Sequence, residues 1–93
     1  MDMVVRDNPE RSRYELLVDD TLVGIADYVA DGKVMVFPHT VIDAERRGQG
    51  LGAVLIAGAL DDVREKGNVV VPRCWFVAEF IEQNADYADL LAG

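Results

Sequence analysis

The sequence predicts an α/β (α+β) fold with the element order β-β-β-α-β-α and a mixed sheet. Three observations lead to this prediction: an Asp-Gly hairpin signature between two β-prone runs, a long amphipathic helical stripe, and a β-branched run after it. The chain has 93 residues, of which 51% are hydrophobic and 28% charged, so disorder and low complexity are excluded. We expect residues 1–93 to form a single domain.

Three strands are predicted before the helix. Residues 13–18 carry strand formers, and residues 22–29 alternate in part between two faces. Asp31-Gly32 is a pair favoured in tight hairpins, so a third strand follows over residues 34–42. Because proline cannot donate to a strand ladder, we expect a bulge or an edge at Pro38.

The amphipathic stripe predicts a long helix over residues 50–66, and Gly67 stands where a helix C′ residue belongs. Its apolar positions are Leu55, Ile56, Ala59, Leu60 and Val63. Residues 69–71 are predicted to be a buried strand and residues 75–83 a second helix. The strand–helix–strand crossover implies that residues 40–42 and 69–71 run parallel.

Composition limits the partners. The formal net charge of −8 disfavours nucleic acid and anionic membranes, which require clustered Lys and Arg, whereas an amine would be tolerated. The sequence has no apolar run of about 18–20 residues, and its start has no signal-peptide pattern. The single cysteine, Cys74, forms neither an internal disulfide nor a metal cluster. We therefore expect no metal and a reducing, cytoplasmic location.

A glycine-rich run separates the third strand from the long helix. It consists of Arg46, Arg47, Gly48, Gln49, Gly50, Leu51 and Gly52. Alternate glycines allow positive φ and expose N–H groups beside a helix N-terminus, which together favour an anion. Arg47 would add a charge-assisted bond to a phosphate. The spacing matches neither a P-loop nor a dinucleotide-binding fingerprint, and an ordinary strand–helix turn stays an alternative.

The motif Arg47-x-x-Gly50-x-Gly52 resembles the acetyl-CoA-binding loop of GNAT-type N-acetyltransferases. Residues 37–90 also resemble a very short family of this type. The shared stretches are Phe37-x-His39-Thr40-x-Ile42, the glycine run, and Pro72-x-Cys74-x-Phe76-Val77-x-x-Phe80-Ile81-x-x-Asn84-x-x-Tyr87-Ala88-Asp89-Leu90. Most of residues 1–35 lies outside the resemblance.

The resemblance implies a minimal GNAT-like acyltransferase fold whose parallel strands splay apart. It implies acetyl-CoA or coenzyme A as the co-substrate, bound by the run from Arg46 to Gly52, with the pyrophosphate on the backbone N–H groups of Arg47 to Gly52. Exposed backbone around Ile42 would pair with the pantetheine arm. The acceptor would be an amine, either a small molecule or a protein, and is not identified by the sequence.

Two residues are candidates for the chemistry. His39 is the only histidine and suits a general base, unless it merely faces solvent at a sheet end. Cys74 lies after Pro72 and beside Arg73, at the start of a predicted helix that favours a thiolate. It would accept the acetyl group covalently or only shape the pocket, and the alternative is a small buried hydrophobe.

Other side chains carry weaker signals. Tyr87 suits a packing anchor in a further helical turn better than a catalytic acid, and Phe76 and Phe80 suit the core. Asn84 suits a helix cap, while the placement of Trp75 is open. The pairs Asp19-Asp20 and Asp61-Asp62 are interpreted as turn and solvent-face residues. Two other functions compete with the enzyme: a non-catalytic CoA-binding sensor or interaction module, and a structural interaction domain.

Overall fold

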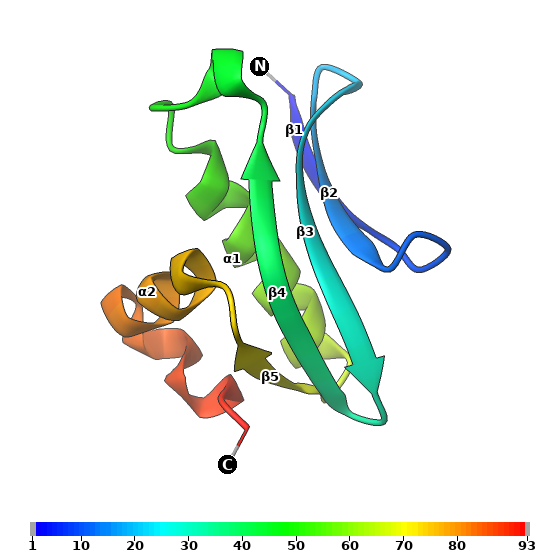
Figure 1. The fold of residues 1–93 in the computed structure, drawn as a ribbon, viewed down its shortest axis with the longest axis vertical. Coiled ribbons are helices and arrows are strands. Elements are labelled where there is room, and N and C mark those ends of the chain that lie inside the picture. The colour runs from blue at the N-terminus through cyan, green and yellow to red at the C-terminus, as the bar shows by residue number, and fades with distance from the viewer. Residues whose placement is uncertain (1, 93) are drawn as a thin grey trace.

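One mixed sheet and two helices make up the fold (Figure 1). The computed structural model describes residues 2–92. The strands are β1 (Met3–Asn8), β2 (Arg13–Val18), β3 (Thr21–Asp31), β4 (Val34–Ile42) and β5 (Val69–Pro72). The helices are α1 (Leu51–Glu65) and α2 (Trp75–Gln83), with short 3-10 turns η1 (Ala44–Arg46) and η2 (Ala85–Leu90). The predicted mixed sheet is confirmed.

The strands lie in chain order, β1-β2-β3-β4-β5. Each of the first three neighbouring pairs is antiparallel, and β4 pairs with β5 in parallel. The hairpin at Asp31-Gly32 is confirmed, with Gly32 at a φ of 60°. The bulge expected at Pro38 is confirmed too: two residues of β4 lie opposite one residue of β3, Tyr28.

The sheet has one strand more than the sequence predicts. Residues 3–8 form β1, an edge strand that pairs with β2 from Met3 opposite Val18 to Asn8 opposite Arg13. Its outer positions are mostly exposed, so the usual apolar alternation is weak there. The element order is therefore β-β-β-β-α-β-α.

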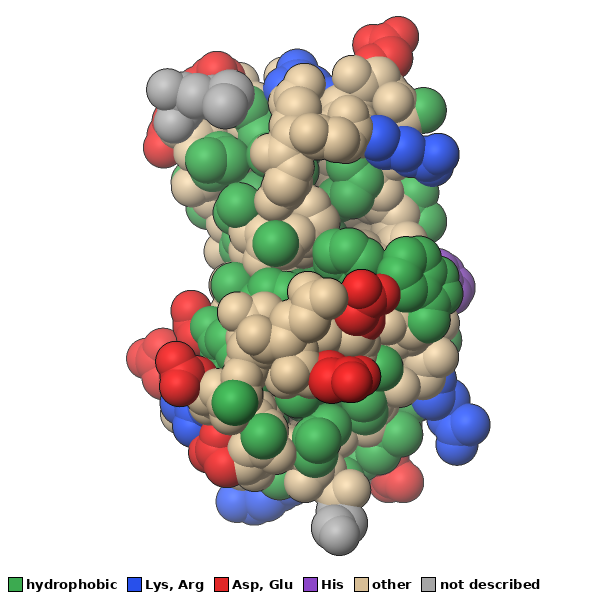
Figure 2. Space-filling view, turned by 90° about the vertical axis from the view of Figure 1, so that its left-hand side faces the viewer, with side chains coloured by type: hydrophobic (Ala, Val, Ile, Leu, Met, Phe, Trp, Pro, Cys, Tyr) green, Lys and Arg blue, Asp and Glu red, His purple; other side chains and the backbone are tan. Residues whose placement is uncertain are grey.

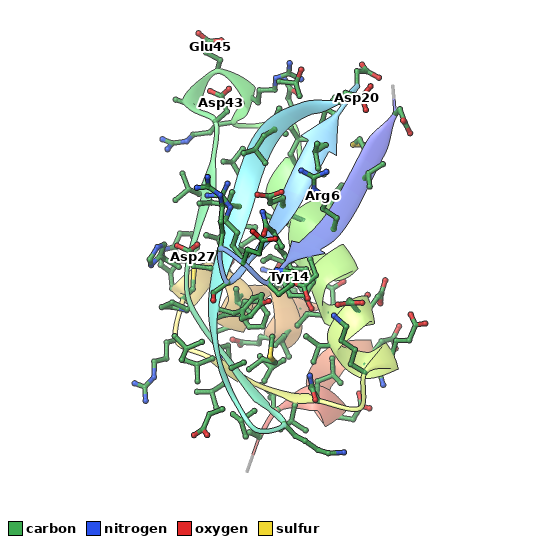
Figure 3. The ribbon with its side chains drawn as sticks, turned by 90° about the vertical axis from the view of Figure 1, so that its right-hand side faces the viewer. Arg6, Tyr14, Asp20, Asp27, Asp43 and Glu45 are labelled. Carbon is green, nitrogen blue, oxygen red and sulfur yellow. The ribbon has the colours of Figure 1, made fainter. Side chains whose placement is uncertain are left out.

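Helix α1 covers one face of the sheet and forms the core with it. The Tyr14 hydroxyl donates to the Asp62 carboxylate of α1 over 2.6 Å, and the Tyr14 ring stacks on Phe37 at a centroid distance of 6.1 Å. Figure 3 shows Tyr14 near the middle of the molecule, between the sheet and α1. Asp62, expected on the solvent face, is instead half buried and hydrogen-bonded. Within residues 2–92, neither helix is long and apolar enough to cross a membrane.

The parallel ladder between β4 and β5 is short. It runs from Val34 opposite Val69 to Phe37 opposite Pro72. The parallel orientation is as predicted, but β5 pairs with the first half of β4 and not with residues 40–42. Beyond Phe37 the two chains diverge, because the segment after Pro72 turns into α2, which lies past β5 at the edge of the sheet (Figure 1).

Candidate active site

A cleft of about 760 Å³ opens where β4 and β5 diverge. Its walls are the second half of β4, the glycine run with the start of α1, and one side of α2. The lining residues are Thr40, Val41, Ile42, Arg46, Arg47, Gly48, Gly50, Leu51, Gly52, Ala53, Cys74, Trp75, Phe76, Glu79, Phe80, Gln83 and Asn84. Figure 2 shows hydrophobic side chains along a depression across this face, with acidic side chains directly below it.

The vertex of the cleft is fixed by backbone hydrogen bonds. The Phe37 carbonyl accepts from the N–H groups of both Arg73 and Cys74, at 3.1 and 2.8 Å. These two bonds end the ladder and direct the chain into α2. On the other edge of β4, the Asp43 N–H donates to the carbonyl of Val23 in β3 over 2.8 Å. Because antiparallel pairing alternates, the backbone groups of Thr40 and Ile42 point away from β3 and into the gap.

The glycine run forms the opposite wall. Gly48 and Gly50 have φ values of 83° and 75°, which only glycine adopts without strain. Gly50 is the N-cap of α1, and no side chain caps that helix. The first N–H groups of α1 are therefore open to a ligand at the positive end of the helix dipole. Figure 3 shows Asp43 and Glu45 beside this run, at one end of the molecule.

The predicted ligand residues of this run fall into two groups. Arg46, Arg47, Gly48, Gly50, Leu51 and Gly52 line the cleft, together with Ile42, whereas the exposed Gln49 lies outside the lining. The Arg47 guanidinium donates through Nε to the Ile42 carbonyl over 3.4 Å. This contact joins the loop to the free backbone edge of β4.

Cys74 lies at the vertex of the cleft. It lies at the start of α2, as the sequence predicts, where it is the N-cap residue, and it is 8% exposed. Its Sγ donates to the Thr40 hydroxyl over 3.7 Å. The thiol is therefore both nearly buried and part of the cleft wall.

His39 lies on the other face of the sheet. Phe37 and Thr40 both face α1, because the bulge at Pro38 shifts the alternation by one residue, and His39 is turned the opposite way. Its side chain is 61% exposed, and Nε2 contacts the carboxylate of Asp27 on β3. His39 is not among the residues that line the cleft, so the structure does not bring it together with Cys74 in one wall.

Six residues of α2 and its C-cap line the cleft: Trp75, Phe76, Glu79, Phe80, Gln83 and Asn84. None was predicted as a site residue. Phe76 and Phe80 are half-buried and pack on the core as expected, yet each also faces the cleft. A Cβ added to Gly52 would lie 2.8 Å from the Phe76 ring, so the two helices meet closely there. The sequence signal that could have identified them is the family resemblance of the stretch from Pro72 to Leu90, which contains all six.

Other candidate residues have structural roles. The Tyr87 hydroxyl donates to Asp61 over 2.8 Å and its ring packs on Phe80, which fits the expected packing anchor. Burial and the bond to Asp61 raise the Tyr87 pKa. The Asn84 amide donates to the Phe80 carbonyl at the end of α2, as a cap does. Residues 2–92 contain no group of three or more His, Cys, Asp or Glu placed to hold a metal ion.

Comparisons with solved structures agree with this geometry. A GCN5-like putative N-acetyltransferase from Staphylococcus aureus is 20% identical, over 97% of this chain and 88% of its own, with a TM-score of 0.71. The ribosomal-protein-S18-alanine N-acetyltransferase from Escherichia coli is 16% identical over 64% of this chain, with a TM-score of 0.60. A ribosomal-protein-alanine N-acetyltransferase from Brucella melitensis is 19% identical over 87% of this chain, with a TM-score of 0.56. These likenesses show a shared fold.

The chain spans 39% of the length of the Escherichia coli structure and 61% of that from Brucella. No curated protein sequence matches it. A family model described as GCN5-related N-acetyl-transferase matches residues 13–90, which is most of the chain. The splayed strands, the glycine loop and this match lead to one conclusion: the chain belongs to the GCN5-related N-acetyl-transferase family.

Proposed function

We propose that this protein binds acetyl-CoA in the cleft and transfers the acetyl group to an amine. One observation carries the proposal: the same cleft has the glycine-capped N-terminus of α1 at one end and a thiol, that of Cys74, at its vertex. The family resemblance implies acetyl transfer from acetyl-CoA to an amine. Acetyl-CoA has the matching layout, with phosphates at one end and a thioester at the other.

The phosphate end would bind at the glycine run. The N–H groups after Gly50 are open, and Arg46 and Arg47 bring two positive charges to the same wall. At a Debye length of about 8 Å, carboxylates in distant parts of the protein are largely screened at this loop. A pyrophosphate is therefore attracted locally although the whole chain carries a net charge of −8.

The pantetheine arm would follow the free edge of β4. Its amides are the donors and acceptors that the backbone groups of Thr40 and Ile42 lack on this side. The Ile42 carbonyl is already engaged by Arg47, so the arginine is expected to release it or to share it when the arm binds. The arm would thus add a strand-like partner where β5 has diverged.

Transfer has two routes. In the direct route the amine nitrogen attacks the thioester carbon, the C–S bond breaks, and the coenzyme A sulfur leaves with the electron pair. In the covalent route the Cys74 sulfur attacks the thioester carbon, the C–S bond of acetyl-CoA breaks, and coenzyme A leaves with the electron pair and the cysteine proton. The amine then attacks the Cys74 thioester, whose C–S bond breaks and restores the cysteine. In both routes the amine loses one proton, which the departing thiolate takes up; His39, paired with Asp27 on the other face of the sheet, does not line the cleft and is not placed to act as the base.

The placement of the side chains favours the covalent route. Cys74 lines the cleft at the vertex, beside the Thr40 hydroxyl, whereas His39 lies on the other face. A free thiol of this kind fits a reducing, cytoplasmic setting.

The test begins with calorimetric titration of the protein with acetyl-CoA, coenzyme A and adenosine 3′,5′-bisphosphate. All three are expected to bind, and absence of binding would refute the proposal. Incubation with acetyl-CoA followed by peptide mass spectrometry should find a hydroxylamine-sensitive acetyl group on Cys74 that is passed on to an amine. Full turnover by Cys74→Ala would establish the direct route. Binding without product from any amine would instead identify a CoA-binding module.

A further inference from the structure

Helix α2 presents two rows of side chains to the cleft. The inner row, Phe76 and Phe80, is half-buried and packs against the core, and Phe76 touches the start of α1. The outer row, Trp75 and Glu79, is one helical turn apart and exposed, although both residues line the cleft. Packing against the core explains why the residues of the inner row are hydrophobic, so this row does not indicate a ligand. The outer row is not used by the packing or by the proposed CoA contacts.

Trp75 is the more unusual of the two. It is 73% exposed and follows the thiol-bearing Cys74 directly. Its ring meets Phe76 edge-on, at a centroid distance of 5.8 Å and an interplanar angle of 81°. Tryptophan is normally buried, and its electron-rich face is the best aromatic surface for an ammonium ion. A large exposed aromatic ring at the mouth of a cleft therefore indicates a ligand that covers it.

Glu79 supplies a charge of the matching sign. One of its oxygens accepts from the Gln83 amide over 3.2 Å, which holds the carboxylate along the cleft wall. It is the only carboxylate among the described residues that line the cleft, and the two arginines lie on the opposite wall, at the glycine run. The phosphates of coenzyme A are attracted to that run and repelled by Glu79. The carboxylate is thus left to face a cation.

We propose that Trp75 and Glu79 form the recognition site for the ammonium group of the acceptor, so that the substrate class is an aliphatic, positively charged amine. This inference rests on the proposed function, because it names the acceptor of the same cleft. The net charge of −8 attracts such a substrate from solution. The site retains the ammonium form beside the vertex, and one proton passes from the nitrogen to water before the nitrogen attacks the thioester.

Trp75 makes a direct test feasible, because it is the only tryptophan in the chain. Its fluorescence is followed while CoA-loaded protein is titrated with tetramethylammonium, a cation that cannot be acetylated, and with tert-butanol, its neutral match in shape. We expect a saturable change with the cation alone. Glu79→Gln should raise the apparent Kd for the cation about two- to five-fold, as fits one exposed charge contact.

Glu82→Gln is the matched control. Glu82 lies on the same helix and is exposed, but it lines a separate hollow and not the cleft. Both variants change the net charge equally, so only a local contact separates them. Equal responses to tetramethylammonium and tert-butanol, or equal losses in Glu79→Gln and Glu82→Gln, would overturn the inference.

A kinetic measurement separates this inference from the proposed function. At saturating acetyl-CoA, Glu79→Gln should raise the KM for n-butylamine about two- to five-fold while the KM for an uncharged arylamine is unchanged. Trp75→Leu should raise the n-butylamine KM more than Trp75→Phe, which keeps an aromatic face. Turnover with unchanged n-butylamine KM in these variants would refute the ammonium site alone. Failure of acetyl-CoA to bind the unaltered protein would refute the proposed function itself.

Discussion

Replacement of Gly50 by valine tests the phosphate-binding end of the cleft. Gly50 has a φ of 75°, and a Cβ placed there would meet no atom within 4 Å. The new side chain would therefore project into open space at the cleft wall without a clash inside the protein. A non-glycine residue in this conformation costs about 1–2 kcal/mol, against a typical stability of about 5–15 kcal/mol. We expect Gly50→Val to stay folded.

Coenzyme A binding should be lost in the same variant. The valine methyl groups would hold phosphate oxygens away from the N–H groups at the start of α1. A hydrogen bond to a charged group contributes about 1.5–3 kcal/mol, so the loss of one such bond raises Kd about 10- to 150-fold. Calorimetric titration measures this change, and thermal unfolding of the same sample shows whether the fold is kept.

Gly67→Val separates ligand obstruction from backbone strain. Gly67 follows the other end of α1, has a φ of 72°, and also has no atom within 4 Å of an added Cβ. The two variants therefore carry similar strain, but Gly67 does not line the cleft. Its Kd for coenzyme A should match the unaltered protein. The reasoning is refuted if Gly50→Val binds coenzyme A within about threefold of the unaltered protein, or if Gly67→Val loses binding equally.

Two further predictions concern charged residues. Arg47→Ala should weaken coenzyme A binding by about 1.5–3 kcal/mol in calorimetry, and should weaken the binding of pantetheine, which has no pyrophosphate, by less. Equal losses for the two ligands would show that Arg47 only maintains the loop conformation through its hydrogen bond to the Ile42 carbonyl. Burial opposes ionisation of Glu15, but hydrogen bonds from Arg13, Arg6 and Asn8 hold its pKa below the usual value. Its contribution to stability is therefore present above about pH 4.5 and lost as pH falls through the lowered pKa. Urea unfolding from pH 7 to 3 should show a shallower acid loss in Glu15→Gln, and parallel curves would contradict this.

Local patterns were sufficient for most of the fold. The stripe of α1 is buried as its spacing predicts, and α2 begins and ends at the predicted residues, 75 and 83. Each of these signals lies within one element, where periodicity and capping act over a few residues. The glycine run was likewise found because positive φ and helix start are local properties.

β1 was missed because its identity depends on tertiary contacts. As an edge strand with an exposed outer face, it has little apolar alternation. Its place is fixed instead by contacts with other elements: Arg6 donates to the buried Glu15 of β2 over 3.0 Å, and Val5 lies against Gly58 of α1, where an added Cβ would stand 2.6 Å away. Because Arg6 comes from the missed strand, the buried carboxylate of Glu15 also could not be foreseen.

The positions of His39 and Cys74 follow from a single extra residue. A regular strand would put Phe37 and His39 on one face of β4. The bulge at Pro38 instead turns Thr40 to the face of Phe37, where it meets the Cys74 thiol, and turns His39 to Asp27. The sequence indicates a bulge, but not on which side of it each residue falls.

The cleft itself arises where hydrogen bonding between β4 and β5 stops. The Arg73 N–H makes the last ladder bond, to the Phe37 carbonyl, and the same carbonyl also accepts from the Cys74 N–H as the chain turns into α2. The backbone groups of Thr40 and Ile42 are thereby left facing the gap, and polar groups in such a place require a partner. The proposed pantetheine arm, extended and carrying amide groups, would satisfy them and end beside Cys74. The same backbone event thus opens the site, creates its binding edge and places the thiol at its vertex.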